Sequence, residues 1–328
     1  MTAVPASYGE PFQLTGRPVL SRGRLNRQEP PPADPVARKE LWAKAKVLTL
    51  DQFGCVPTLR GGTGLVYRAP DEFGAEPPEK GVLLGERDGV GYWTIRINRP
   101  DAQVPDWRSW QPAVADSAAE QWLDLRMTGA ILNDTDAGAF TTASAVLNWQ
   151  RNSGFCAKDG SPVRFVKGGW ASRCQSCDRE EYPRTDPAVI CLVHDGIGVN
   201  GRRVLLARGT PWPPGRMSVL AGFVEAGESL EDCVVREIGE EVGVPVWDVR
   251  YLGNQPWPFP RSLMIGFTAV GDPETPLLPA DGEIAEARWV TREEVRSVLA
   301  NGGSHNGLAL PGAVSIAGQM LAAWAAAD

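Results

Sequence analysis

The chain has 328 residues, of which 43% are hydrophobic and 22% charged, which is an ordinary globular composition and neither disordered nor fibrous. Its formal net charge of -7 excludes a global pull toward nucleic acid or an anionic membrane, so any polyanionic partner needs a local basic patch or metal ions. No run of 18 or more apolar residues occurs, and Met1–Glu10 lacks the features of a signal peptide. We therefore expect a cytoplasmic protein of two or three domains with no membrane partner.

The N-terminal 150 residues are expected to form an α/β domain with a small sheet and a partly extended lead-in. The lead-in covers the first 35 residues, which are rich in Pro and Arg. Apolar runs divided by turn signals predict strands at Ala45–Leu50, Gly64–Tyr67, Gly81–Leu84 and Tyr92–Ile97. Helical spacing over Asp136–Trp149 predicts a helix with Asp136 as its N-cap, and we place the first domain boundary just after it.

Residues 151–185 contain too few aliphatic side chains for a core of their own, so another part of the chain must hold them. Over residues 186–328 the pattern becomes an alternation of strands and helices, which we expect to be a separate domain. Strands are predicted at Ala188–His194, Val204–Ala207, Val249–Leu252, Leu263–Val270 and Ala287–Val290. Helices are predicted at Ser229–Val242, Arg292–Leu299 and Ser315–Ala326.

A glycine loop leads directly into the first of these helices. The sequence GFVEAGESLEDCVVREIGEEVGV over Gly222–Val244 matches the Nudix box at every defined position. On a helix Glu237, Glu240 and Glu241 stand at i, i+3 and i+4, so the three carboxylates share one face. Like charges this close repel by about a few tenths of a kcal/mol per pair. Divalent cations remove that repulsion, and oxygen ligands suit Mg²⁺ or Mn²⁺, so we predict a metal site rather than a solvated acidic helix.

Metal ions at this helix would neutralise a pyrophosphate and lower the pKa of a water held in line with a phosphorus, so the box predicts metal-assisted hydrolysis. Glu240 and Glu241 are both open as the general base, and a metal-bound hydroxide could also serve without direct help from either. Arg236 is expected to point off the acidic face and to pair with Glu228, bracing the loop against the helix. Turn geometry is expected to explain Gly222, Gly227 and Gly243.

A proline-rich segment, Asn254-Gln-Pro-Trp-Pro-Phe-Pro-Arg-Ser262, follows the box. Three prolines make it stiff, and Trp257 and Phe259 offer flat apolar faces suited to stacking on a base or to a subunit contact. By itself the segment is better explained as a rigid packed turn.

The box followed by Gln-Pro-Trp-Pro-Phe-Pro-x-Ser resembles the NADH pyrophosphatase family of Nudix hydrolases. The resemblance extends from about Leu147 to the C-terminus and includes YPRTDPAVI at Tyr182–Ile190 and DGEIAEARW at Asp281–Trp289, with Asn254 replacing the usual serine. It implies an α+β protein: a C-terminal Nudix α/β/α sandwich, a zinc-ribbon-like segment and the N-terminal domain. It also implies a homodimer whose sites include residues of both chains, and cleavage of NAD(H) to NMN(H) and AMP.

The same resemblance implies the site residues. Metal ligation is implied for the Ala221 carbonyl, Glu237, Glu241 and Glu283, with Glu240 near the metals. Phe223 should stack on the nicotinamide. Further substrate contacts are implied for Tyr182, the backbone at Ala317, and Gln255, Pro256, Trp257, Pro258, Phe259, Pro260, Arg261 and Ser262.

The family carries two Cys-x₂-Cys knuckles, a pattern typical of structural zinc, but this chain is one cysteine short. Cys174-Gln-Ser-Cys177 is intact, whereas the first knuckle reads Cys156-Ala-Lys-Asp159. Because a carboxylate can ligate zinc, we expect a structural Cys₃Asp site, the alternative being a ribbon that has lost its metal. The other cysteines are expected to be buried small apolar residues: Cys55, Cys191 and Cys233.

Removal of NAD caps from RNA 5′ ends is chemically admissible, because the scissile bond is the same pyrophosphate. Local arginines such as Arg179, Arg184 and Arg261 could guide the RNA. Two other functions compete. A Nudix hydrolase of ADP-ribose or another nucleoside diphosphate derivative would not need the Gln255–Ser262 loop. A catalytically silent nucleotide sensor would be expected to carry a broken box.

Overall fold

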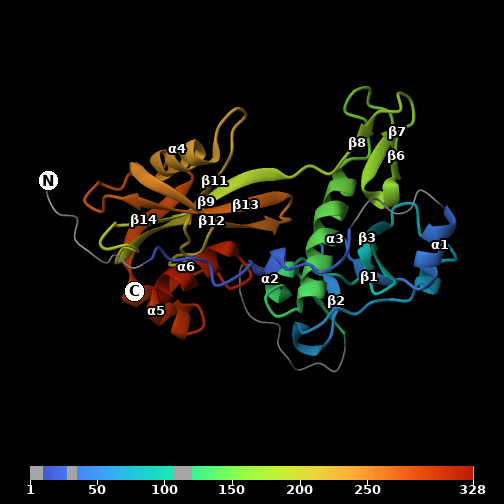
Figure 1. Cartoon of the computed structure of the whole chain (residues 1–328), viewed down its shortest axis with the longest axis horizontal. Coiled ribbons are helices and arrows are strands. Elements are labelled where there is room, and N and C mark those ends of the chain that lie inside the picture. The colour runs from blue at the N-terminus through green and yellow to red at the C-terminus, as the bar shows by residue number, and fades with distance from the viewer. Residues whose placement is uncertain (1–9, 28–34, 106–119, 328) are drawn as a thin grey trace. The chain divides into compact units, whose positions relative to one another are not determined.

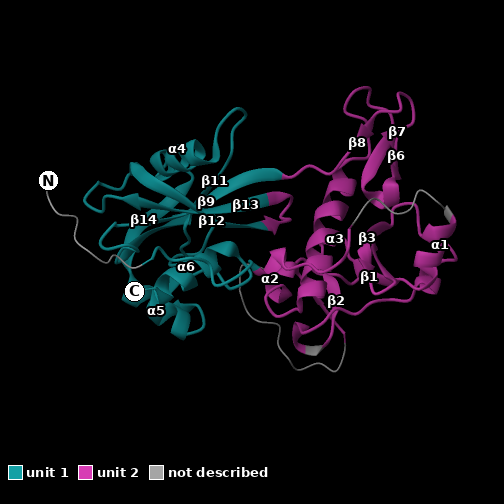
Figure 2. Ribbon diagram, in the orientation of Figure 1, with its two compact units in different colours: residues 1–18, 186–255, 263–328 teal, residues 19–185, 256–262 magenta. Residues whose placement is uncertain are grey.

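The computed structural model describes residues 10–27, 35–105 and 120–327. The chain divides into two compact units (Figure 2). Unit 1 comprises residues 1–18, 186–255 and 263–328, and unit 2 comprises residues 19–185 and 256–262. Of the predicted lead-in, residues 10–27 are described and contain one short 3₁₀ helix, Val19–Ser21, whereas its run of three prolines lies outside the described residues. Among the described residues, no helix is long and apolar enough to cross a membrane.

Unit 1 is built on a six-stranded sheet with the order β12-β13-β9-β10-β14, to which β11 adds by pairing with β9. Its strands are β9 (Asp186–His194), β10 (Arg203–Gly209), β11 (Leu220–Phe223), β12 (Val246–Trp257), β13 (Ser262–Gly271) and β14 (Ile284–Thr291). Its helices are α4 (Leu230–Val242), α5 (Arg292–Ala300) and α6 (Ile316–Ala326), and a short hairpin is formed by β15 (Ser304–His305) and β16 (Leu308–Ala309). The strands and helices predicted for this region are confirmed, with shifted ends, and β11, β15 and β16 are additions.

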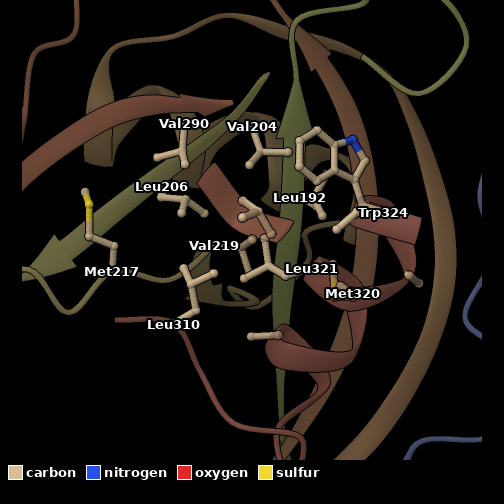
Figure 3. Close-up of a cluster of buried hydrophobic side chains, with 14 of the residues drawn as sticks. Leu192, Val204, Leu206, Met217, Val219, Val290, Leu310, Met320, Leu321 and Trp324 are labelled. Atoms are coloured by element: carbon tan, nitrogen blue, oxygen red, sulfur yellow. The ribbon is translucent and has the colours of Figure 1, made fainter. Parts of the chain in front are cut away.

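Helices cover both faces of this sheet, α4 on one side and α5 and α6 on the other (Figure 1). Alternate residues of β9 show the two faces: Leu192 packs in the cluster with Met320, Leu321 and Trp324 of α6 (Figure 3). Its neighbour Cys191 packs in the cluster formed with α4. A strand buried on both faces needs apolar residues at every position, which explains the continuous apolar run of β9. The expected α/β/α sandwich is confirmed.

Unit 2 contains a three-stranded sheet, ordered β1 (Lys46–Leu50), β4 (Val90–Arg96) and β3 (Val82–Arg87), beside a two-stranded sheet of β2 (Val56–Thr58) and β5 (Gln121–Leu123). Its helices are α1 (Pro35–Ala43), α2 (Leu125–Thr128) and the long α3 (Asp134–Asn152). Trp42 and Trp93 meet edge to face at 5.3 Å between ring centroids, in a small core of their own. The small sheet and the closing helix are confirmed.

Two expectations for unit 2 are wrong, and Asp136 explains both. The N-cap of α3 is Asn133, whose side chain accepts hydrogen bonds from the second and third residues that follow it. Asp136 is instead buried inside the first turn, where it accepts the Leu65 N–H at 3.2 Å and the Tyr67 hydroxyl at 2.7 Å. The Gly64–Tyr67 segment therefore gives the Leu65 N–H to a carboxylate and forms one isolated bridge, between Leu65 and Thr58, rather than a strand.

The cysteine-bearing segment folds as a three-stranded sheet of β6 (Val163–Val166), β7 (Ala171–Cys174) and β8 (Glu180–Glu181). Two hydrogen bonds join it to the rest of unit 2. Gln150 of α3 donates to the Gly169 carbonyl at 3.0 Å, and the Trp170 indole donates to the Leu83 carbonyl of β3 at 2.7 Å. A segment with little core of its own is thus held by its neighbours, as its composition predicts.

Candidate active site and zinc ribbon

The box forms strand β11, a loop and helix α4, all within unit 1. β11 runs antiparallel to β9, with Gly222 opposite Val189. α4 begins after Ser229, whose hydroxyl oxygen accepts the Asp232 N–H at 3.1 Å, and ends at Gly243 with φ 73°. A serine N-cap and a left-handed glycine are strong start and stop signals, so these two residues set where α4 begins and ends.

Glu237 turns from α4 toward β11. A Cβ placed on Gly222 would lie 1.8 Å from Cδ of Glu237, so the carboxylate occupies the space that any other residue would fill. The turn-geometry expectation is confirmed for Gly227, at φ 90°, and for Gly243. It is wrong for Gly222, which lies in a strand and is required because of this close approach.

Glu241 is the most buried of the box carboxylates, at 6% exposure, and it receives a backbone hydrogen bond from Ala221. Its Oε2 atom has no hydrogen-bond partner among the described residues. Burial, followed by the charges of Glu237 and Glu283, raises the pKa of Glu241 to about 8. A buried oxygen without a partner among like charges fits a hard divalent cation, which would supply the missing positive charge.

Glu283 lies just before β14, far from the box in sequence, and the structure brings it to the same place. The Ala280 N–H donates to the Glu241 carbonyl, and the Leu278 N–H donates to the Val242 carbonyl, both at 2.9 Å. These bonds fasten the turn ahead of Glu283 to the end of α4. The charge of Glu283 accordingly contributes to the raised pKa of both Glu237 and Glu241.

Arg236 pairs with Glu228 as expected, with Nε 2.7 Å from Oε1, and the bonds from Arg236 lower the pKa of Glu228 to about 2. The expectation that Arg236 points away from the acidic face is wrong. Its NH1 atom lies 3.1 Å from Glu237 and 2.9 Å from Glu240, and NH2 donates to the Phe223 carbonyl at 3.0 Å. One guanidinium, with its rigid fork of donors, therefore neutralises part of the repulsion and joins β11, the loop and α4.

Three residues implied as substrate contacts occupy different surroundings. Phe223 is 58% exposed at the end of β11, and Ala317 is buried at the start of α6. In unit 2, Tyr182 is 52% exposed, and its hydroxyl donates to Glu180 at 2.7 Å. Lys167 bonds to the same hydroxyl and lies 4.8 Å from the ring centroid. The sequence pattern gave no sign of this Lys167 contact.

The proline-rich loop is divided between the units. Gln255, in unit 1, is fully buried and donates to the Val314 carbonyl at 2.9 Å, while Gln319 donates to its Oε1 at 3.3 Å. Its side chain thus ties the start of the loop to the segment that leads into α6. In unit 2, Trp257 packs edge to face on Phe259 at 4.8 Å between centroids, and the remaining loop residues are Pro256, Pro258, Pro260, Arg261 and Ser262.

The ribbon brings its four predicted ligands together. One potential ligand atom from each of Cys156, Asp159, Cys174 and Cys177 lies within 4.8 Å of the others, a gathering of ligand atoms that no second cluster matches in the described part of the chain. The sulfurs of Cys156 and Cys177 are 3.8 Å apart, and Cys174 Sγ is 3.5 Å from Asp159 Oδ1. Bonds of about 2.3 Å to sulfur and about 2.0 Å to oxygen, arranged tetrahedrally, give ligand separations of this size, so the donor set fits zinc.

The other three cysteines are buried, as expected: Cys55, Cys191 and Cys233. Burial raises the pKa of Cys233 to about 12, with Glu228 adding to the effect.

A carboxylate-bearing box on an α/β/α sandwich is the arrangement of a Nudix hydrolase, and the family model for the NUDIX domain matches residues 184–309. The model for the NADH pyrophosphatase zinc ribbon domain matches residues 151–182. The model for the NADH pyrophosphatase-like rudimentary NUDIX domain matches residues 38–149. The chain therefore belongs to the NADH pyrophosphatase family of Nudix hydrolases.

Two relatives compared by sequence agree with this assignment. The NAD-capped RNA hydrolase NudC of Mycobacterium bovis is 44% identical over 325 residues, covering 98% of each chain. The NAD-capped RNA hydrolase NudC of Deinococcus radiodurans is 44% identical over 177 residues, covering 53% of this chain and 61% of its own. A NUDIX hydrolase structure from Nitrosomonas europaea aligns with a TM-score of 0.37 and 25% identity, covering 43% of this chain and 78% of that one.

Proposed function

We propose that this protein hydrolyses the pyrophosphate bond of NAD(H), giving NMN(H) and AMP, and that it removes NAD caps from RNA 5′ ends. The observation that carries the proposal is that a complete box and the Gln255–Ser262 loop occur together in one member of this family. The box supplies the hydrolytic chemistry, and the loop supplies the preference for a dinucleotide. Relatives at 44% identity bear the name NAD-capped RNA hydrolase, which supports the RNA substrate.

The carboxylates of Glu237, Glu241 and Glu283, with the Ala221 carbonyl, would hold Mg²⁺ or Mn²⁺. Bound there, the ions neutralise the pyrophosphate and lower the pKa of a water. This assignment is supported by the Oε2 atom of Glu241, which has no partner within the described ranges, and by the convergence of the three charges. Arg236 would hold α4 and β11 together, so that the ligands carried by the two elements stay close to one another.

The reaction adds one water molecule across a bond between phosphorus and the bridging oxygen of the pyrophosphate. The water oxygen bonds to one phosphorus, the bond from that phosphorus to the bridging oxygen breaks, and each product carries one phosphate. A proton from the water passes to a carboxylate oxygen. Glu240 and Glu241 are the two candidates: Glu240 is exposed and engaged by Arg236, whereas Glu241 is buried, with one oxygen that accepts no hydrogen bond from the part of the chain that the structure describes. Comparing how the rates of Glu240→Gln and Glu241→Gln depend on pH would show which of the two carboxylates is the general base.

The substrate class is tested by presenting NADH, ADP-ribose and NAD-capped RNA to the same preparation with Mn²⁺. We expect NADH and the capped RNA to be cleaved with kcat/KM at least about 10-fold above that for ADP-ribose, because the loop recognises the second nucleotide. A preference for ADP-ribose would favour the competing nucleoside diphosphate activity. Phe223, on its exposed position, is proposed to stack on the nicotinamide, and Tyr182 to contact the substrate.

We further propose that the Cys₃Asp cluster binds zinc in a structural role, since four protein ligands leave no open position. We also propose domain boundaries after residues 150 and 185. The protein is proposed to be a homodimer and to be located in the cytoplasm, where it would meet both substrates. Analytical ultracentrifugation tests the oligomeric state: sedimentation at twice the chain mass supports a dimer, and sedimentation at the chain mass contradicts it.

A further inference from the structure

The proline-rich loop needs partners from outside itself. Prolines have no backbone N–H, so Pro256, Pro258 and Pro260 cannot donate to one another or to a neighbouring strand. The loop carbonyls still require donors, because a buried carbonyl without one costs free energy. Pro258 is buried, and residues 256–262 belong to unit 2. We therefore expect the donors to these carbonyls to come from other parts of unit 2.

Asn148 of α3 supplies them. Its Nδ2 atom donates to the Pro258 carbonyl at 3.1 Å and to the Pro260 carbonyl at 3.4 Å. The orientation of the amide is fixed from its other end, because NH2 of Arg96 donates to Oδ1 at 3.2 Å. Arg96 is itself held, since its NH1 donates to the Asp51 carbonyl at 2.9 Å. A chain of hydrogen bonds thus runs from β4 through α3 to the loop.

Arg126 of α2 holds the aromatic part of the same loop. Its guanidinium carbon lies 3.5 Å from the centroid of the Phe259 ring, a close cation–π contact. The buried carboxylate of Asp124 holds Arg126 in place, with NH1 3.1 Å from Oδ2. Because Phe259 packs on Trp257, the contact with Arg126 orients both aromatic rings.

We infer that Asn148 and Arg126 are positioning residues that hold the loop in its substrate-binding shape, so that the rudimentary domain takes part in substrate selection. The inference rests on the proposed function of the loop. It gives the N-terminal half of the chain a role in the reaction through the loop. Misplacing a substrate-binding group by about 1 Å can cost a factor on the order of 100 in rate, so two weak contacts can matter.

The first test is Asn148→Asp, which keeps the size of the side chain and an acceptor for Arg96 but removes the donor. Asn152→Asp is the matched control: it makes the same change one helical turn along α3, where the amide bonds, among the described residues, only to the Asn148 carbonyl. We expect the KM for NADH to rise about 10-fold in Asn148→Asp but less than about 2-fold in Asn152→Asp. The Mn²⁺ concentration for half-maximal activity should be the same in both, because the box is untouched.

The second test does not depend on activity. Trypsin cleaves after arginine, and Arg261 is exposed at the end of the loop. Release of the loop should make cleavage between Arg261 and Ser262 several-fold faster in Asn148→Asp than in Asn152→Asp. Mass spectrometry of the fragment that ends at Arg261 measures the rate. Arg126→Lys, which keeps the charge and loses the flat contact with Phe259, should give a smaller effect in the same direction. It replaces Asn148→Asp should that variant fail to fold.

Each result has a stated consequence. Equal KM values and equal cleavage rates in the Asn148 and Asn152 variants, with wild type active on NADH, would overturn the inference and leave the proposed function standing. Wild-type protein inactive on NADH would overturn the proposed function, and the inference with it. A raised KM together with faster tryptic cleavage in Asn148→Asp supports both.

Discussion

The Glu237 carboxylate occupies the place where Gly222 would carry a side chain: a Cβ there would be 1.8 Å from Cδ of Glu237. This contact joins the strand that presents the Ala221 carbonyl to the helix that presents the carboxylates. The glycine at the start of the box is therefore explained by packing against a proposed ligand, rather than by backbone conformation.

Gly222→Ala should consequently impair catalysis more than folding. The contacting atoms are the far end of a flexible side chain, so the carboxylate can swing away from the added methyl group at little cost to stability, but it then leaves its position. We expect kcat/KM for NADH to fall by about 100-fold, with thermal unfolding nearly unchanged. Gly239→Ala is the control, because a Cβ there meets nothing within 4 Å and should stabilise α4 by about 1 kcal/mol. Equal activity of the two variants would refute this explanation.

Purified protein should contain one zinc ion per chain. Asp159→Ala should lose it and lower the melting temperature by at least about 5 °C, because metal binding by a segment without its own core stabilises the folded state. Asp159→Cys should retain zinc. Asp178→Asn changes a neighbouring acid that is outside the cluster and should behave as wild type. Plasma mass spectrometry gives the stoichiometry, and a metal-free wild type would contradict the site.

His194 should make the stability of unit 1 depend on pH. The side chain is buried, and its Nδ1 accepts the Gly196 N–H at 3.1 Å. Burial lowers the pKa of His194 below 6.5, an effect aided by Arg250 and Arg292 and opposed by Asp195 and Asp248.

The unfolded chain therefore binds a proton at higher pH than the folded one. Stability is fully present above pH 6.5 and is lost as the pH falls toward the folded pKa, by up to about 1.4 kcal/mol per pH unit. His194→Asn keeps an acceptor for Gly196 and cannot titrate, so its denaturation midpoint should fall less between pH 7 and pH 5. Parallel curves for wild type and variant would contradict the prediction.

The elements of unit 1 could be predicted because their signals are local. Apolar periodicity and the Ser229 and Gly243 caps place α4, and the continuous apolar run of β9 indicates a strand covered on both faces. The prediction for Asp136 was wrong because it also used only a local signal. An acidic residue ahead of an apolar helix indicates an N-cap, and only the tertiary fold shows that Asp136 bonds to Leu65 and Tyr67.

The site residues that escaped local patterns are held by distant contacts. Glu283 entered only through the resemblance, since a single acid in a turn carries no signal, and its approach depends on backbone bonds from Leu278 and Ala280 to α4. Asn148 could not be found at all, because it meets Pro258 across 110 residues of sequence. Arg236 was predicted to pair with Glu228; its pair with Glu240 is an i,i+4 contact that helical spacing could have indicated, whereas its bond to the Phe223 carbonyl depends on the fold.

The most direct test of the central claim is product analysis of NADH incubated with wild-type protein and Mn²⁺, beside Glu241→Gln and Glu231→Gln. Glu231 lies exposed in the first turn of α4, so its variant makes the same change away from the proposed ligands. We predict AMP and NMNH in equal amounts from wild type and Glu231→Gln, and a rate lower by at least about 100-fold for Glu241→Gln. Absence of AMP and NMNH from the wild-type reaction would contradict the account.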